Sequence, residues 1–253
     1  MAGYDEHFYD SAATDLGHTS AAAVAEKVFE LIAPKSFVDL GCGNGAWTKA
    51  FSDRGGIDDY LGIDGPWVDP AWLDIPAERF RKGDLAVGAG LDRTYDLAIS
   101  VEVAEHLPQA SAEGFVDTLT GASSVVLFSA AIPYQGGTGH VNEQWPSYWA
   151  AKFAARGFVP VDILRTPLWD REDIAFYYRQ NLTFFVRESE LADYPKLAEG
   201  HAHTGGALPD LIHPEVWTRR SLQPINIPRI VGRERAERLR DAVNNRRRRI
   251  TRS

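Results

Sequence analysis

The segment of residues 37–45, FVDLGCGNG, constrains the fold more than any other stretch of the chain. An apolar run reaches Asp39, and glycines then occupy the alternate positions Gly41, Gly43 and Gly45. Glycine has no Cβ atom, so such a loop lets the backbone approach a ligand closely and adopt angles that other residues avoid. A strand followed by a glycine loop and a helix is typical of α/β sheets that bind an adenosyl ligand at the carboxyl ends of their strands.

The loop by itself leaves two adenosyl ligands open, a dinucleotide and S-adenosylmethionine. Residues 41–46 satisfy the relaxed G-x-G-x-x-A dinucleotide fingerprint, and Asp64 follows about 20 residues later, as that fingerprint expects. Other parts of the chain must therefore distinguish between the two ligands.

Apolar runs that alternate with helical patterns predict the architecture around the loop. Strands alternating with helices indicate a doubly wound α/β sheet with right-handed crossovers. The predicted strands are 36–40, 60–63, 95–101, 124–130, 158–164 and 182–186, and the predicted helices are 20–33, 46–54, 110–120 and 145–156. Residues 79–82 lead up to a Gly-Asp-Leu segment at 83–85.

Composition narrows the class of protein. A chain of 253 residues with 44% hydrophobic and 25% charged residues is ordinary for a soluble globular protein. Cys42 is the only cysteine, so no internal disulfide can form, and a reducing cytoplasmic setting is expected. The acidic, aromatic start of the chain does not resemble a signal peptide, and the longest apolar stretch, 125–133, is too short to span a bilayer. We therefore expect no membrane partner.

Charge is distributed unevenly along the chain. Residues 229–253 carry ten arginines and three acidic residues, a net +7, so the remainder carries −15 of the total of −8. This basic tail could contact nucleic acid or a membrane, fold back on the acidic body, or be a frayed terminus. An acidic domain argues against nucleic acid as the main substrate.

Two motifs resemble the class I S-adenosylmethionine-dependent methyltransferases. The segment VDLGCGNG, 38–45, is similar to the first motif of that family, acid-x-Gly-x-Gly-x-Gly. The segment DLAISVEVAEHL, 96–107, resembles the family's fourth strand, which enters a short turn containing Glu-His-Leu. Dehydrogenases do not typically carry that signature. The resemblance covers about residues 24–186 and implies a mostly parallel, seven-stranded Rossmann-like sheet with S-adenosylmethionine as cofactor.

The resemblance also implies cofactor-binding roles for particular residues. Asp39 would lie near the methionine amino group, where a carboxylate suits an ammonium and a sulfonium but not a pyrophosphate. Asp64 would accept both ribose hydroxyls. The remaining implied cofactor-binding residues are Gly41, Gly43 and Gly45 of the loop, Gly65 beside the ribose, Asp84 and Leu85 at the adenine, and Glu102 and Val103 at the methionine part.

Domain boundaries follow from the same resemblance. Residues 1–188 would form the S-adenosylmethionine-binding methyltransferase domain. Its N-terminal segment, with Tyr4, Phe8, Tyr9 and His18, resembles a lid over the cofactor. Residues 189–253, which are punctuated by prolines, would form a C-terminal extension with the arginine-rich tail.

The acceptor side is predicted from residues 132–149, IPYQGGTGHVNEQWPSYW, which follow the fifth strand. An alcohol acceptor needs a site for its proton, and histidine titrates near neutral pH, so His140 is the expected base and Glu143 its assistant. In the alternative reading, His140 and Glu143 cap the following helix and fix the loop. His140 with Glu143, or His201 with His203 and His213, could contribute metal ligands. No dense carboxylate array accompanies them, and we expect no metal.

Together these patterns predict methyl transfer to an oxygen, or second to a nitrogen, of a small-molecule acceptor. The acceptor segment resembles methyltransferases of sugar and secondary-metabolite clusters. One alternative is an NAD(P)-dependent oxidoreductase. Another is a non-catalytic cofactor-binding regulatory or assembly protein that acts through its arginine tail. Nucleic-acid methylation is disfavoured because no Asn-Pro-Pro-Tyr motif occurs. A homodimer is a further expectation.

Overall fold

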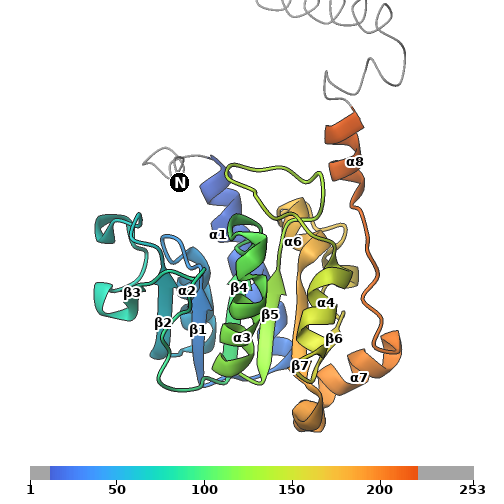
Figure 1. The fold of residues 1–253 in the computed structure, drawn as a ribbon, viewed down its shortest axis with the longest axis horizontal. Helices are drawn as coiled ribbons and strands as arrows, with labels where there is room; N and C mark the ends of the chain where they lie inside the picture. The colour runs from blue at the N-terminus through green and yellow to red at the C-terminus, as the bar shows by residue number, and fades with distance from the viewer. Residues whose placement is uncertain (1–11, 222–253) are drawn as a thin grey trace, which may run out of the picture. The chain divides into compact units, whose positions relative to one another are not determined.

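The computed structural model describes residues 12–221, and Figure 1 shows their arrangement. Contacts within the chain divide it into two compact units, Met1–Leu211 and Ile212–Ser253. The described part of the second unit contains one helix, α8, at Pro214–Ser221. The lid residues Tyr4, Phe8 and Tyr9 and the arginine-rich tail lie outside the described residues.

A seven-stranded sheet forms the centre of the first unit. Its strand order is β3-β2-β1-β4-β5-β7-β6. Every pairing is parallel except those of β7, which runs antiparallel to both β5 and β6. The predicted doubly wound, mostly parallel α/β sheet is therefore confirmed. The strands are β1 Ser36–Leu40, β2 Asp59–Asp64, β3 Phe80–Lys82, β4 Leu97–Val101, β5 Val125–Ser129, β6 Phe158–Val161 and β7 Thr183–Arg187.

Helices cover both faces of this sheet, as Figure 1 shows for α3 and α4 on the nearer side. The α-helices of the unit are α1 Ala12–Leu31, α2 Ala46–Gly55, α3 Ala112–Ala122, α4 Pro146–Ala154, α5 Arg165–Leu168, α6 Phe176–Asn181 and α7 Pro195–Thr204. Short 3₁₀ turns join them, among them Ala104–His106 directly after β4. The turn Ala104–His106 carries the Glu-His pair that the sequence singled out.

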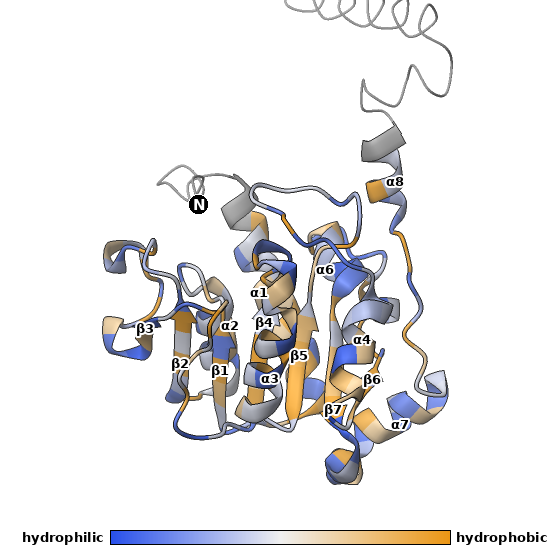
Figure 2. Ribbon diagram, in the orientation of Figure 1, coloured by the Kyte–Doolittle hydropathy of each residue, from blue (hydrophilic) through white to orange (hydrophobic). Residues whose placement is uncertain are grey.

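Alternation along the central strands explains why both faces are covered. In β5, Val125 and Leu127 belong to one apolar cluster, whereas Val126 and Phe128 belong to a second cluster on the opposite face. Successive side chains of a strand point to opposite faces, so an apolar strand needs a helical layer on each side. The central strands are correspondingly apolar in Figure 2. Helices α1 and α2 contribute to the first cluster, and α3 and α4 to the second.

The first unit continues to Leu211, beyond the expected end of the domain at residue 188. Helix α7 packs against β6, and at Gly200 its backbone lies so close to the segment after β6 that an added Cβ would be 2.8 Å from the Ile163 side chain. Residues 189–211 therefore belong to the same compact unit as the sheet.

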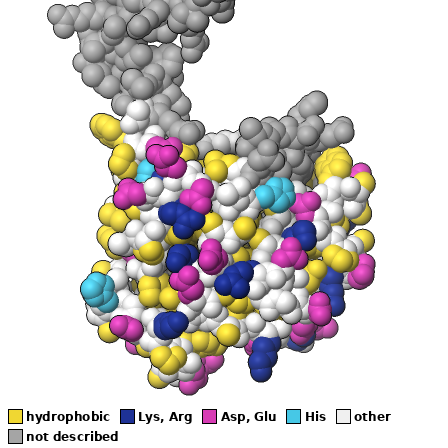
Figure 3. Space-filling view, turned by 180° about the vertical axis from the view of Figure 1, so that it is seen from behind, with side chains coloured by type: hydrophobic (Ala, Val, Ile, Leu, Met, Phe, Trp, Pro, Cys, Tyr) yellow, Lys and Arg dark blue, Asp and Glu magenta, His cyan; other side chains and the backbone are white. Residues whose placement is uncertain are grey.

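The surface carries charges of both signs. On the face shown in Figure 3, basic and acidic side chains are interspersed across the described part of the chain, and no broad basic patch is visible on that face. Within residues 12–221, none of the helices combines the length and apolar character that crossing a membrane would require.

Candidate functional site

The glycine loop joins β1 to α2 at the carboxyl edge of the sheet. Gly41, Gly43 and Gly45 have φ angles of +92°, +57° and +90°, in the region that favours glycine. A Cβ atom on Gly41 would lie 2.3 Å from a methyl carbon of Val103, so the fourth-strand turn touches the loop directly. The loop is thus restricted to glycine by its backbone angles and, at Gly41, also by its neighbour.

Asp39, in β1, is buried beneath this loop with 2% of its surface exposed. The hydroxyl of Thr48, in α2, donates a hydrogen bond of 2.7 Å to its Oδ2. Burial raises the pKa of Asp39 to about 7, the Thr48 hydrogen bond opposes that rise, and the nearby Asp64 carboxylate adds to it. The protein therefore holds a carboxyl group that a cationic ligand nearby would ionise readily.

Asp64 ends β2 and binds the loop from the other side. Its Oδ2 accepts a hydrogen bond of 2.7 Å from the amide of Gly43, and its Oδ1 accepts one of 2.6 Å from the amide of Gly65. Burial raises the pKa of Asp64, and hydrogen bonds from Gly43, Gly65 and the Trp67 side chain oppose the rise. The indole of Trp67 lies 2.2 Å from where a Cβ of Gly65 would be. Trp67 thus explains the need for glycine at position 65.

Asp74 fastens the loop to α1, a role that sequence reasoning missed. Its amide donates to the carbonyl of Asn44 at 2.7 Å, and its Oδ2 accepts from the Asn44 side chain at 2.9 Å. The same Oδ2 lies 2.8 Å from Nε2 of His18. His18, which was expected in a lid, therefore packs beside the glycine loop through Asp74.

Asp84 and Leu85 follow β3, as predicted. Asp84 is exposed, and its Oδ1 accepts a hydrogen bond of 3.0 Å from the amide of Ala86, which shapes a turn. Leu85 is buried in the apolar cluster of α3 and α4. These positions are compatible with both the turn and the adenine role, which stays a prediction.

Glu102 follows β4 and adopts a φ angle of +53°, unusual for a residue other than glycine. Its carboxylate accepts hydrogen bonds from the side-chain amides of Gln135, at 2.7 Å, and Asn181, at 3.1 Å. Burial raises the pKa of Glu102 and these hydrogen bonds oppose the rise. Gln135 and Asn181 belong to the β5–α4 loop and to α6, and no local motif marked them.

The turn after β4 anchors the acceptor loop. The carbonyl of Glu105 accepts hydrogen bonds from the amides of Val141, at 2.9 Å, and Asn142, at 3.0 Å. These bonds bring His140 next to Glu105 and His106. The backbone of Glu105 thus fixes the acceptor loop to the turn after β4.

His140 and Glu143 interact as predicted. Nδ1 of His140 lies 2.9 Å from Oε1 of Glu143, whose carboxylate also accepts hydrogen bonds from the amides of Tyr134 and Gly136, at 2.8 Å and 2.6 Å. Helix α4 begins at Pro146, and the side chain that accepts from an amide of its first turn is Asp210, at 2.9 Å from the nitrogen of Ser147. The helix-capping part of the alternative reading is therefore wrong for His140 and Glu143, and the loop-fixing part is right. A Glu143 carboxylate accepts a hydrogen bond from Nδ1–H of His140, and in the neutral ring the lone pair is then on Nε2.

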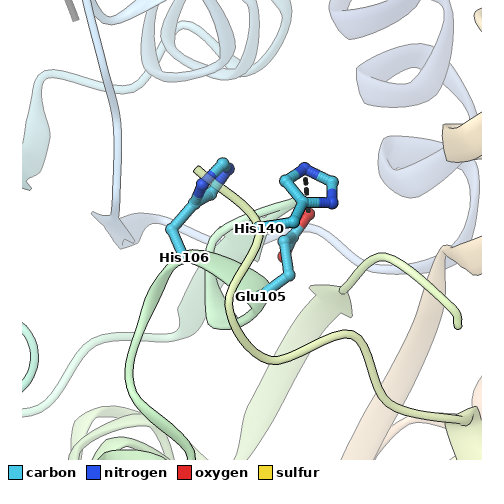
Figure 4. A group of neighbouring side chains, drawn as sticks. All are labelled: Glu105, His106 and His140. Carbon is cyan, nitrogen blue, oxygen red and sulfur yellow. Dashed lines mark ion pairs between the residues drawn. The ribbon is translucent and has the colours of Figure 1, made fainter. Parts of the chain in front are cut away.

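Glu105, His106 and His140 lie together in Figure 4. Nε2 of His140 is 4.0 Å from Oε1 of Glu105, and the two imidazole rings meet edge to face with centroids 4.8 Å apart. Burial and the Glu102 carboxylate raise the pKa of Glu105 well above its usual range, and the backbone of Ala131 lowers it by less. Burial, and then His140, lower the pKa of His106 to about 4. Both histidine rings thus adjoin a deeply buried carboxyl group.

Comparisons with known proteins agree with this geometry. A family model described as a methyltransferase domain matches residues 12–158, more than half of the chain. No curated protein sequence is significantly similar. Among solved structures, DesVI of Streptomyces venezuelae is 15% identical, with a TM-score of 0.50, and the match covers 70% of this chain and 99% of that one.

Two further structures have the same fold. A provisionally assigned O-methyltransferase from Nostoc punctiforme is 15% identical, with a TM-score of 0.51, and the match covers 69% of this chain but only 58% of that one. A chain in the complex of the Haloferax volcanii Trm112 methyltransferase activator with a methyltransferase is 18% identical, with a TM-score of 0.50, and the match covers 74% and 99%.

These likenesses, at identities below 20%, concern the fold, whereas the family model concerns the sequence itself. The expected adenosyl ligand, the seven-stranded sheet and the motif after β4 all point the same way. The chain therefore belongs to the methyltransferase domain family and is an S-adenosylmethionine-dependent methyltransferase.

Proposed function

We propose that this enzyme methylates an oxygen atom of a small-molecule acceptor, such as a sugar or a natural product, and that His140 accepts the proton. The observation that carries the proposal is the 2.9 Å contact of Nδ1 of His140 with Glu143. That contact leaves Nε2 as the acceptor atom of the ring, on a loop that follows β5 at the carboxyl edge of the sheet.

The cofactor supplies a sulfonium methyl group, whose carbon–sulfur bond breaks with both electrons going to sulfur as the acceptor oxygen bonds the carbon. The protein must orient the acceptor and receive its proton. His140 has 11% of its side chain exposed, so it is shielded from water yet open enough to meet a substrate. Glu143 holds the ring in one orientation and stabilises the imidazolium that forms.

Cofactor binding in this proposal uses both sides of the glycine loop. Asp39 is assigned to the ammonium group, and its raised pKa fits a site awaiting a cation. Asp64 is assigned to the ribose hydroxyls, with loss of its present hydrogen bond to Gly43 on binding. The other assignments are Gly41, Gly43 and Gly45 around the methionine part, Gly65 at the ribose, Asp84 and Leu85 at the adenine, and Glu102 and Val103 beside the methyl group.

The test compares His140→Ala and Glu143→Gln with His203→Ala, a matched control on the exposed side of α7. Acceptors are first found by screening hydroxylated and amine-containing small molecules for S-adenosylhomocysteine release. We expect kcat to fall by about 10²–10⁴ in His140→Ala. Glu143→Gln should lose less, and His203→Ala should behave as the parent. Calorimetric affinity for S-adenosylmethionine should be unchanged in all three variants.

An unchanged kcat in His140→Ala would remove the base from the proposal. Methylation of only amine acceptors in the screen would overturn the oxygen assignment. Calorimetry with NAD and S-adenosylmethionine side by side also separates this reading from a dehydrogenase.

A further inference from the structure

We propose that Glu105, His106 and His140 form a binding site for a divalent first-row transition-metal ion, which contacts the acceptor. Each residue offers one ligand atom, and the three atoms lie within 4.8 Å of one another. Figure 4 shows the two imidazoles side by side above the buried carboxyl group. The ion would replace the sequence-based expectation of a metal-free protein.

The strongest observation is the isolation of the Glu105 carboxyl group. Its side chain is 0% exposed, and neither of its oxygen atoms makes a hydrogen bond of ordinary geometry to a described residue, although the backbones of Glu105 and Ala131 and the Glu102 carboxyl group lie close enough to affect its pKa. A buried polar group without a partner is costly, and natural proteins compensate such groups with a hydrogen bond, an opposite charge or a metal ion. Nε2 of His140 faces it at 4.0 Å, too far for a hydrogen bond.

The supporting contacts have the arrangement that metal-bound histidines require. A ligating imidazole almost always uses its second nitrogen to donate to a carboxylate or a backbone carbonyl. Nδ1 of His140 is held by Glu143 at 2.9 Å, and Glu143 is in turn held by the amides of Tyr134 and Gly136. The ring of His106 hydrogen-bonds to the backbone of Gly139.

Space beside Nε2 of His140 depends on Gly137. A Cβ atom at that position would lie 2.2 Å from Nε2. No positive φ angle explains the glycine there, so the absent side chain has a steric purpose. The Gly137 backbone packs against the edge of the His140 ring, so a side chain at this position would push the ring away from Glu105 and His106.

The donor set indicates which ions fit. Two imidazoles and one carboxylate suit Mn²⁺, Fe²⁺, Co²⁺ or Zn²⁺, whereas Mg²⁺ and Ca²⁺ prefer oxygen ligands. Metal–ligand bonds are about 2.1 Å long, so two atoms bound to one ion lie about 3 Å apart. The three donor atoms, now within 4.8 Å of one another, would have to move closer together. Small rotations of the two partly exposed rings can supply that contraction.

The role of the ion rests on the proposed function, although its binding does not. Three protein ligands leave positions for the acceptor oxygen, and coordination lowers the pKa of a bound hydroxyl. With the ion present, Nε2 of His140 would be a metal ligand and could not also accept the proton, so the proposed oxygen acceptor is kept while the ion replaces His140 as the activating group and the acceptor proton passes to water.

The experiment uses tag-free, full-length protein treated with EDTA and without S-adenosylmethionine or acceptor. Titration with Co²⁺ is followed by visible d–d absorption and calorimetry. We expect one ion per chain and a rise in Tm on binding. His106→Ala, His140→Ala and Gly137→Ala should each weaken affinity about tenfold or more, Gly137→Ala with every ligand intact. Glu143→Gln should weaken it about 10–100-fold through the second shell. His203→Ala and Gly114→Ala are matched controls that should bind as the parent does.

Glu105→Gln keeps the shape of the side chain and tests the carboxylate without creating a cavity. Its folding is checked by its Tm without metal. If Co²⁺ does not bind, or if His106→Ala and His140→Ala bind it with the affinity of the parent protein, the proposal is wrong and the cluster shares only a proton. Failure of the proposed function would look different, since metal binding would persist while no hydroxyl acceptor is methylated.

Discussion

The cofactor side and the acceptor side of the site are built in different ways. The cofactor side rests on one continuous segment, residues 37–46, whose backbone angles and missing side chains shape it. The acceptor side is assembled from side chains of the β4 turn, the β5–α4 loop and α6, which meet only in the folded chain, and Glu102, assigned above to the methyl group of the cofactor, would lie where the two sides meet. A cofactor common to a whole family needs an invariant backbone cradle, whereas an acceptor is matched by side chains that can differ between relatives.

Charge is also handled differently on the two sides. The buried carboxyl groups of Asp39 and Asp64 accept hydrogen bonds from a hydroxyl and from backbone amides. Glu102 depends on two side-chain amides, and Glu105 has no side-chain hydrogen bond of ordinary geometry to a described residue. The carboxyl groups of Asp39 and Asp64 would therefore be compensated by a cationic ligand that binds from solution. Those of Glu102 and Glu105 are compensated by other groups of the protein or, as we propose, by a metal ion.

The largest expected effect is the change of stability with pH that the buried Asp39 carboxyl group causes. The pKa of Asp39 is about 7 in the folded protein against 3.8 ordinarily, so between these values the folded state binds more protons than the unfolded state. Its contribution to the free energy of unfolding therefore falls as pH rises through that window, by about 4 kcal/mol in all. Asp39→Asn should be more stable than the parent at pH 8, equally stable near pH 4, and weaker in binding S-adenosylmethionine. Urea unfolding at both pH values measures this, and parallel pH profiles would contradict it.

Gly41→Ala tests whether the backbone shapes the cofactor side. The substitution combines a φ angle of +92° with a close contact to Val103, and we expect a loss of about 3 kcal/mol in stability together with loss of cofactor binding. Gly114→Ala is the matched control, since nothing lies within 4 Å of its Cβ position on helix α3, and it should be stabilising by up to about 1 kcal/mol. Equal effects in the two variants, measured by urea unfolding, would show that the loop tolerates side chains.

Asn181→Leu tests the side-chain network of the acceptor side. The substitution removes one of the two amide donors to Glu102, so we expect a loss of about 2 kcal/mol in the free energy of unfolding. A double-mutant cycle that combines Asn181→Leu with Glu102→Gln should reveal a coupling energy of about 1 kcal/mol, because Glu102→Gln removes the charge that Asn181 compensates. Strictly additive losses would mean that the two side chains act independently.

Asp84→Ala should have the smallest effect on stability, because the side chain is exposed and makes only a local turn. Its predicted role at the adenine would instead appear as a several-fold loss of S-adenosylmethionine affinity, measured by calorimetry. Affinity equal to that of the parent would leave Asp84 with the turn alone.

The regions of the chain differ in how much of their structure could be predicted from the sequence. The central strands and the glycine loop were predicted closely because continuous apolar runs and alternate glycines are local patterns. Helix α1 begins at Ala12, earlier than the predicted 20, and β6 ends at Val161 instead of 164. Element ends are set by packing and capping rather than by periodicity, so such shifts are expected.

On the acceptor side, the pairing of His140 with Glu143 was predicted because the two residues lie close along the chain. The supporting amides of Gln135 and Asn181, the tether of Asp74 to His18, and the meeting of His140 with Glu105 escaped prediction. Each of these contacts joins segments far apart in sequence, and no spacing rule records it.

The amino-acid sequence alone was sufficient to establish the α/β sheet, the adenosyl ligand and the methyltransferase class. The sheet and an adenosyl ligand follow from short-range rules, namely apolar strand runs and the freedom of glycine, whereas the methyltransferase class follows from the resemblance of residues 38–45 and 96–107 to a known family. Only the tertiary structure shows which carboxyl groups are buried and which groups surround them, as at Glu102 and Glu105. The desolvation of a carboxyl group is the combined effect of all the segments packed around it, so it is determined only when the sheet and its helices have assembled.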